Sequence, residues 1–177
     1  IISVARYSPE KQLLHQLEVV QRLKNEFPDI ELHLYGFGFK IGQQMKQFIQ
    51  QHGLEKNVFL RGFMPNLTDE YDKASLALMT SLEEGFSLST LEAESHGVPV
   101  IGYKICYGPD EIIEDSINGY LVEPNNIEQL YTKVREYLLD TNIQHQFMVN
   151  AYESVERYEE KNIARSWKRL VEDVLAH

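Results

Sequence analysis

The chain is organised around the segment Thr80-Ser-Leu-Glu-Glu-Gly-Phe-Ser-Leu-Ser-Thr-Leu-Glu-Ala-Glu-Ser-His-Gly-Val-Pro-Val-Ile101. A short apolar run, Leu76 to Met79, predicts a strand just before it. Gly85 permits a tight turn, and Ser87 is suited to cap the helix that follows. Residues 98–102 then predict another strand. The segment therefore predicts a strand, a turn, a helix and a second strand in succession.

The predicted helix begins just beyond the carboxyl end of a strand. Its first backbone N–H groups and the positive end of its dipole are suited to bind a phosphate group. Glu84 precedes this helix, and Glu92 lies about two turns into it. The two carboxylates could be a general acid and base, a metal pair, acceptors for hydroxyl groups, or simply a solvated acidic helix. The residues alone leave these roles open.

Strands and helices alternate along the rest of the chain. Connections of a few residues are typical of right-handed crossovers, so we expect an α/β fold with a Rossmann-like parallel sheet covered by helices on both faces. We expect one domain over residues 1–139 and C-terminal helices in residues 140–177 that pack on it. The expected strands are 1–5, 30–35, 57–61, 76–79, 98–103 and 120–122, and the expected helices are 9–27, 39–52, 67–74, 87–96, 110–115 and most of 126–177, with breaks near 140–142 and 158.

Composition narrows the classes of function. The formal net charge is -10, and the acidic residues are spread along the chain without a basic stripe, which argues against nucleic acid as a partner. The single cysteine, Cys106, fits a reducing compartment, so a cytoplasmic location is expected. No apolar run is long enough to predict a transmembrane segment.

The chain opens directly in a predicted strand, Ile1 to Ala5. We expect from this that an N-terminal partner domain precedes it in a longer protein. That domain would be absent from the chain described here.

Two basic residues follow the first predicted strand. Arg6 and Lys11 would lie at the carboxyl edge of the sheet, where α/β proteins bind ligands. Arg6 could bind phosphate oxygens through two parallel hydrogen bonds, and Lys11 could bind them as a point charge. It is equally good to interpret both residues as solvated surface charges.

The turn Gly36-Phe-Gly38, with Gly42, resembles a dinucleotide-binding fingerprint but has the wrong last spacing. A tight turn is the better interpretation, and at Gly38 it could let the backbone approach a ligand. The six histidines (His15, His33, His52, His96, His145 and His177) show no metal-ligand spacing, and few other ligands surround the two glutamates. We therefore predict no metal site.

Five motifs occur in one fixed order: Arg6-x4-Lys11, Gly36-Phe-Gly38, Glu84-Gly-Phe-Ser-Leu-Ser-Thr-Leu-Glu92, Gly97-Val-Pro-Val100 and Asn118-Gly-Tyr-Leu-Val122. Together they resemble the C-terminal half of a family 4 retaining glycosyltransferase, which has the GT-B architecture of two Rossmann-like domains facing a cleft. The resemblance extends from Ser3 to about Leu139. It implies that residues 1–139 bind a nucleotide-sugar donor, that no cofactor or divalent metal is needed, and that the absent N-terminal domain binds the acceptor.

The resemblance also implies a role for individual residues. Arg6 and Lys11 would hold the diphosphate and stabilise the leaving group, and Glu84 would bind hydroxyls of the donor sugar. These three are the expected catalytic residues. The expected donor-binding residues are Gly38 in its turn, Met64 against the base, Phe86, Ser87 and Leu88 through backbone N–H groups, and Glu92 on the ribose.

A narrower likeness concerns residues 103–113 together with Glu94-Ser-His-Gly97. These segments resemble the branch that glycosylates wall teichoic acids or serine-rich surface adhesins, which implies UDP-glucose or UDP-N-acetylglucosamine as the donor. We expect the isolated domain to catalyse little or nothing, and the whole protein to act in the cytoplasm, with attachment to the inner membrane face through the absent domain. A partner subunit, a homo-oligomer, a UDP-sugar epimerase half and a non-catalytic scaffold are left open.

Overall fold

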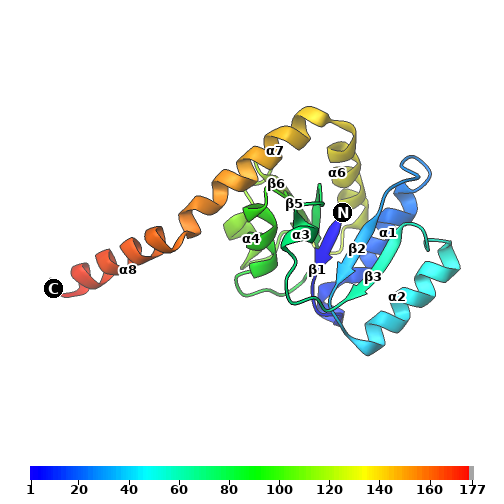
Figure 1. Cartoon of the computed structure of the whole chain (residues 1–177), viewed down its shortest axis with the longest axis horizontal. Helices are drawn as coiled ribbons and strands as arrows, with labels where there is room; N and C mark the ends of the chain where they lie inside the picture. Colours follow the sequence, from blue (N-terminus) through cyan, green and yellow to red (C-terminus); the bar gives the residue numbers. More distant parts are fainter. Residues whose placement is uncertain (176–177) are drawn as a thin grey trace.

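Six parallel strands form a single sheet in the computed structural model, which describes residues 1–175 (Figure 1). The strand order β3-β2-β1-β4-β5-β6 means that the chain first adds strands on one side of β1 and then crosses to the other side. Ile2 accordingly pairs with both His33 and Ala77. This order confirms the predicted Rossmann-like sheet. The strands are β1 (Ile2–Val4), β2 (Leu32–Tyr35), β3 (Val58–Gly62), β4 (Ala77–Met79), β5 (Val100–Tyr103) and β6 (Gly119–Val122).

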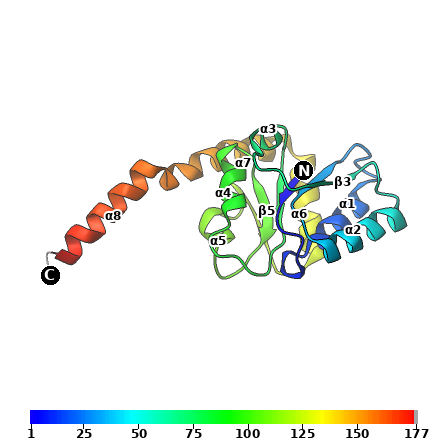
Figure 2. The ribbon, with the colours of Figure 1, turned by 60° about the horizontal axis from the view of Figure 1, so that its bottom comes forward.

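Helices cover both faces of the sheet (Figures 1 and 2). They are η1 (Pro9–Lys11), α1 (Leu13–Leu23), α2 (Phe39–His52), α3 (Thr68–Tyr71), α4 (Leu88–Ser95), α5 (Pro109–Ile112), α6 (Ile127–Leu139), α7 (Thr141–Ser154), η2 (Val155–Tyr158) and α8 (Glu160–Leu175). Side chains alternate along β4: Leu78 packs in the core beneath α1, α2 and α6, and Ala77 and Met79 pack in the core beneath α3 and α4. Within residues 1–175 no helix is both long and apolar enough to cross a membrane.

The predicted helix over residues 9–27 is wrong at its start. Gln12 adopts a left-handed conformation with φ of 47°, which separates the short 3-10 helix η1 from α1. The carbonyl of Lys11 accepts a hydrogen bond from the Thr80 hydroxyl at 2.9 Å and so is held by a residue far away in the sequence. The helix expected over residues 110–115 is also shorter, because the Asn118 side-chain amide donates to the Ile112 carbonyl at 3.1 Å and fixes a turn there.

The C-terminal helices only partly fulfil the prediction that residues 140–177 pack on the domain. Helix α7 does so, with Phe147 and Ala151 buried against the rest of the chain. Helix α8 has no buried residue and projects away from the domain (Figures 1 and 2), so the packing predicted for it is wrong. The break lies at η2 and at the extended Glu159, which redirect the chain. Residues 176–177, including His177, lie outside the described residues.

Two glycines let the loop after β2 lie against the loop after β1. A Cβ atom added at Gly36 would be 1.8 Å from the Ala5 carbonyl oxygen, and one at Gly38 would be 2.0 Å from that of Tyr7. The Tyr7 N–H donates to the Phe37 carbonyl at 3.0 Å, so the two backbones are in direct contact. The glycine motif is thus a close-approach turn, as the tight-turn interpretation predicted.

Substituting Gly38→Ala should destabilise the fold by about 3 kcal/mol or more, because the new methyl group would overlap backbone atoms. Gly42→Ala is the matched control, since its Cβ would make only an ordinary contact at 3.6 Å inside α2. That variant should be neutral or more stable by about 0.5–1 kcal/mol. Urea unfolding measures both, and equal stabilities for the two variants would contradict the close contact.

Trp167 is the only tryptophan, and 63% of its surface is exposed on α8. Its fluorescence in the 177-residue chain should therefore resemble that of tryptophan in water and be readily quenched by acrylamide. Emission shifted to the blue and shielded from the quencher would show that α8 packs against other residues in solution.

Candidate functional site

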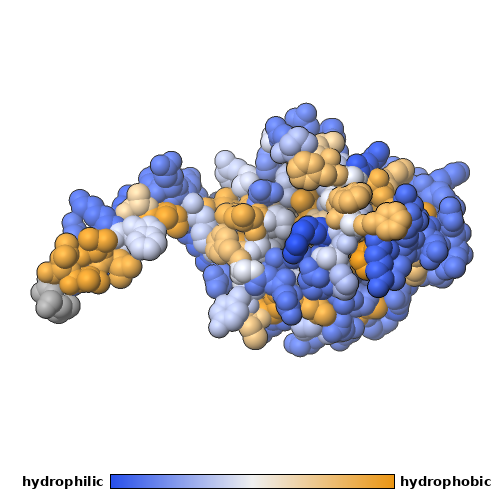
Figure 3. Space-filling view, turned by 90° about the horizontal axis from the view of Figure 1, so that it is seen from below, coloured by the Kyte–Doolittle hydropathy of each residue, from blue (hydrophilic) through white to orange (hydrophobic). Residues whose placement is uncertain are grey.

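The carboxyl ends of β1 and β4 lie side by side, because the strand order reverses between them. Strand β1 runs downward from the N-terminus in Figure 1, so the view from below in Figure 3 looks onto this edge of the sheet. The segment from Arg6 to Lys11 follows β1, and the segment from Thr80 to Ser87 follows β4. Ligands of α/β proteins bind at such a switch point, and the sequence-predicted basic and acidic residues meet here.

Lys11 and Glu84 form the central contact of this edge. The Lys11 Nζ donates to Glu84 Oε1 at 2.8 Å, and the Ser81 hydroxyl donates to the same oxygen at 2.7 Å. The side chains of Lys11 and Glu84 are only 12% and 16% exposed. The family resemblance assigns Lys11 to the diphosphate and Glu84 to the donor sugar, and in the structure the two side chains bond directly to each other. The ammonium group is thereby held in place at the edge.

Arg6 is placed differently from Lys11. Its side chain is 82% exposed, and its guanidinium lies 3.6 Å from Glu10, which also accepts a hydrogen bond from Ser8 at 2.5 Å. Arg6 stands at the rim of an open hollow of about 520 Å³. The residues lining this hollow are mostly apolar: Val4, Ala5, Arg6, Tyr35, Gly36, Phe37, Phe63, Met64 and Leu67. Met64 thus lies at the predicted edge, while Gly38 packs against the neighbouring loop and is not among these residues.

The start of α4 differs in detail from the prediction. Ser87 occupies the capping position in a left-handed conformation, but its hydroxyl bonds to the Thr90 hydroxyl at 2.7 Å and caps no backbone N–H. The side-chain cap predicted for Ser87 is therefore wrong. The first N–H groups of a helix have no partner within the helix and remain available to a ligand. Phe86 packs edge-on against Tyr158, and Leu88 is largely exposed.

Glu92 lies further along α4, next to a packed group of side chains. The Tyr71 hydroxyl lies 3.4 Å from Glu92 Oε2, and the Tyr71 ring stacks on His96, which pairs with Asp72 at 2.7 Å. Burial, with the nearby Glu92 carboxylate, raises the pKa of Tyr71. Within residues 1–175 no group of three or more His, Cys, Asp or Glu side chains could hold a metal ion.

The same helix carries a buried acid, Glu94, which the sequence marked only as part of the branch-specific segment and not as a buried residue. Glu94 is 0% exposed, and its Oε2 is hydrogen-bonded to Ser154 on α7 at 2.6 Å and to Asn118 at 3.2 Å. Burial raises its pKa to about 8, although the hydrogen bond with Ser154 and the charge of Arg157 oppose the shift. A protonated Glu94 can donate to the Ser154 hydroxyl, which is then free to donate to the Ala151 carbonyl at 2.7 Å.

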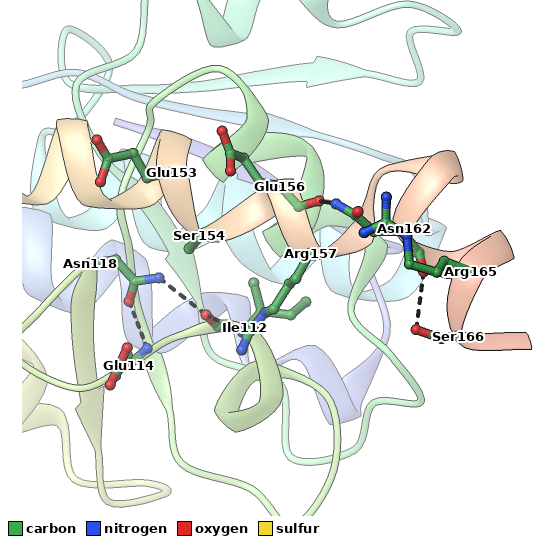
Figure 4. A pocket seen from close by; sticks show the side chains of 10 residues that line it. All are labelled: Ile112, Glu114, Asn118, Glu153, Ser154, Glu156, Arg157, Asn162, Arg165 and Ser166. Carbon is green, nitrogen blue, oxygen red and sulfur yellow. Dashed lines mark hydrogen bonds between the residues drawn. The ribbon is translucent and has the colours of Figure 1, made fainter. Parts of the chain in front are cut away.

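Ser154, Asn118 and Arg157 also line a separate open pocket of about 620 Å³ near the junction of η2 and α8 (Figure 4). Arg157 there donates to the carbonyls of Glu111 and Ile112. No residue that directly follows β1 or β4 lines this pocket. The edge with Lys11 and Glu84 is therefore the better candidate for the site.

A Rossmann-like sheet with basic residues, a helix start and an apolar hollow at its switch point defines a protein of the nucleotide-binding α/β class. Residues 1–154 match the family described as "Glycosyl transferases group 1", and the chain belongs to that family. The resemblance found in the sequence motifs is thus confirmed at the level of the family.

Two similar proteins have names that describe the glycosylation of phosphate-containing polymers. The chain is 32% identical over 166 residues to a poly(glycerol-phosphate) alpha-glucosyltransferase of Bacillus subtilis, covering 94% of this chain and 24% of that protein. It is 30% identical over 168 residues to a poly(ribitol-phosphate) alpha-N-acetylglucosaminyltransferase of Staphylococcus aureus, covering 94% of this chain and 34% of that protein.

Two solved structures of glycosyltransferases are similar to this chain in fold. The pneumococcal O-GlcNAc transferase GtfA, in complex with UDP and GlcNAc, superposes with a TM-score of 0.88 at 27% identity, covering 99% of this chain and 36% of that one. Staphylococcus aureus TarM, in complex with UDP, gives a TM-score of 0.87 at 30% identity, covering 96% and 34%. The chain thus spans about a quarter to a third of the length of the curated relatives it matches.

The raised pKa of Glu94 predicts a pH-dependent stability. Between pH 4.5, the ordinary pKa of a glutamate, and about pH 8, the raised pKa of Glu94, the folded protein keeps a proton on Glu94 that the unfolded chain has released. Stabilisation from this group is complete below pH 4.5 and is lost as the pH rises through about 8, by on the order of a few kcal/mol. Glu94→Gln should flatten the decline seen by urea unfolding, while Glu153→Gln, an exposed acid on α7, should not. Equal slopes in all three proteins would contradict a protonated Glu94.

Proposed function

We propose that this chain is the donor-binding part of a retaining glycosyltransferase that transfers glucose or N-acetylglucosamine from a UDP-sugar to a cell-surface polymer or glycoprotein. The observation that carries the proposal is the pairing of Lys11 with Glu84 at the switch point of the sheet, 2.8 Å apart and beside the start of α4. A cation held at a helix start is suited to a phosphate group.

The order of the site residues supports a path for the whole donor. The apolar hollow beside Met64 would take the base, and Glu92, next to α3, would accept hydrogen bonds from the ribose. The diphosphate would then lie between Arg6, Lys11 and the N–H groups that open α4. Glu84 would meet hydroxyls of the transferred sugar, because it lies at the end of this path beside Lys11.

Electrostatics would be the main contribution of this chain to the reaction. When the bond between the sugar and the diphosphate breaks, negative charge grows on the diphosphate. Lys11 is already fixed by Glu84, so little reorganisation is needed for it to face that charge. The formal charge of -10 gives no general attraction for a phosphate, so these local groups must supply it.

The acceptor and partners belong to the same proposal. The names of similar proteins include two polymer glycosyltransferases and a Streptococcus pneumoniae peptide N-acetylglucosaminyltransferase, the GtfA subunit, to which the chain is 29% identical over 181 residues. We infer an acceptor of this kind, bound by a separate N-terminal domain, and leave a partner subunit or a homo-oligomer as alternatives. The reaction would need no metal, and the one cysteine supports a cytoplasmic setting.

Lys11→Ala should weaken UDP binding by about tenfold or more, since a charge-assisted hydrogen bond contributes about 1.5–3 kcal/mol. Ligand-detected NMR titration of the 177-residue chain with UDP measures the effect. Uridine lacks the phosphates and should bind equally to both proteins. Lys46→Ala removes the same charge from an exposed position on α2 and is the matched control.

Two outcomes would contradict the proposed function. Wild-type protein that binds UDP no better than uridine would favour a scaffold without a donor site. Equal UDP affinity in the Lys11→Ala and Lys46→Ala proteins would show that the phosphates bind elsewhere.

A further inference from the structure

A buried series of hydrogen bonds connects Gln16, Thr80 and the backbone of Lys11. Gln16 on α1 is 1% exposed, and its Nε2 donates to the Thr80 hydroxyl at 2.9 Å. Thr80 is also 1% exposed, and its hydroxyl donates to the Lys11 carbonyl at 2.9 Å, with the Gln12 carbonyl at 3.3 Å. This series of hydrogen bonds thus extends from the core of the protein to the backbone of Lys11, whose ammonium group is the fixed cation of the site.

This backbone does not hold its shape by local preference. Gln12 has φ of 47° and ψ of 37°, a conformation that residues other than glycine rarely adopt. Unfavourable backbone geometry persists where surrounding contacts enforce it. The contacts here are the Thr80 hydroxyl on the Lys11 carbonyl and the Leu82 N–H, which donates to the Glu10 carbonyl at 2.8 Å.

Gln16 is a poor choice if its purpose is stability. Its Oε1 atom is buried and has no hydrogen-bond partner among the described residues. Burying such an atom costs free energy that an apolar side chain would not. Its neighbours on the same face of α1, Leu13, Leu17 and Val20, are apolar and buried. The amide donates to the Leu78 carbonyl at 3.4 Å and to the Thr80 hydroxyl at 2.9 Å, and the shorter of these bonds is the one that leads to the site.

We propose that Gln16 and Thr80 are positioning residues that set the location of Lys11 relative to Glu84, and thereby the affinity of the site for a nucleoside diphosphate. The inference rests on the proposed function, since it assumes that Lys11 meets the diphosphate. Gln16 orients the Thr80 hydroxyl, the hydroxyl holds the carbonyl of Lys11, and the Lys11 ammonium then lies 2.8 Å from Glu84 Oε1.

The test uses near-isosteric variants, Gln16→Met and Thr80→Val, with titration of the 177-residue chain by UDP and by uridine. Each variant should bind UDP about three- to tenfold more weakly, the equivalent of one net hydrogen bond, with uridine affinity unchanged. Gln16→Met should unfold at the same or a higher urea concentration than wild type, because a half-satisfied buried amide is removed. A purely structural role would instead lower stability and alter both affinities together.

Two further variants separate the role of the hydroxyl from packing. Thr80→Ser keeps the hydroxyl and should retain wild-type UDP affinity even if it loses stability. Gln21→Met removes another glutamine hydrogen bond of α1, the one to His52 at 2.8 Å, and should leave UDP affinity unchanged.

Contradictory results can be told apart. Wild-type affinity for UDP in both Gln16→Met and Thr80→Val, with Lys11→Ala still weakened, would overturn the positioning role alone. An equal loss in Gln21→Met would do the same, since it would make the effect general to α1. Wild-type protein that does not prefer UDP to uridine would overturn the proposed function and this inference with it.

Discussion

The ion pair between Lys11 and Glu84 depends on most of the fold and organises the candidate site. The two residues are 73 positions apart in the sequence, and they meet only because β1 and β4 are neighbours in the sheet. Both side chains are largely shielded from water, so their attraction is screened less than that of a surface pair. Removal of either partner would leave the other charge poorly compensated. Strand order, loop conformation and site charge are therefore linked through one contact.

Because of this ion pair, Lys11 and Arg6 would contribute differently to the binding of a diphosphate. Lys11 is fixed but shares its charge with Glu84, whereas Arg6 is exposed and its guanidinium lies 3.6 Å from Glu10. A diphosphate at this edge would meet one preorganised group and one that must be ordered on binding, which costs side-chain entropy. The unpaired N–H groups at the start of α4 add a fixed positive field. The site combines rigid donors with one adaptable arm.

The sequence predicted what depends on periodicity, and it failed where distant contacts override local preference. Short apolar runs and the alternation of strands with helices were enough to place the six strands and most of the helices. No local signal marks Gln12 as a helix break, because its conformation is imposed by Thr80, 69 positions from the Lys11 whose carbonyl it holds. Helix α8 has an apolar face, but a pattern shows that such a face exists and not whether anything covers it. A polar residue within the apolar stripe of α1 was the available clue to Gln16.

Among the residues described, two buried side chains have an oxygen without a hydrogen-bond partner, Gln16 on α1 and Glu94 on α4. Each binds the element that carries site residues to a second element: Gln16 ties α1 to the loop after β4, and Glu94 ties α4 to Ser154 on α7. Apolar side chains would pack at these positions with less loss of free energy but could not fix a particular carbonyl or hydroxyl. Departures from optimal stability are expected where geometry has to be specified. Gln16 is connected to Lys11 through Thr80, which places this departure next to the candidate site. The partners of Glu94, Ser154 and Asn118, instead line the separate pocket near η2, so Glu94 fixes the packing of α4 and not the geometry of Lys11 and Glu84.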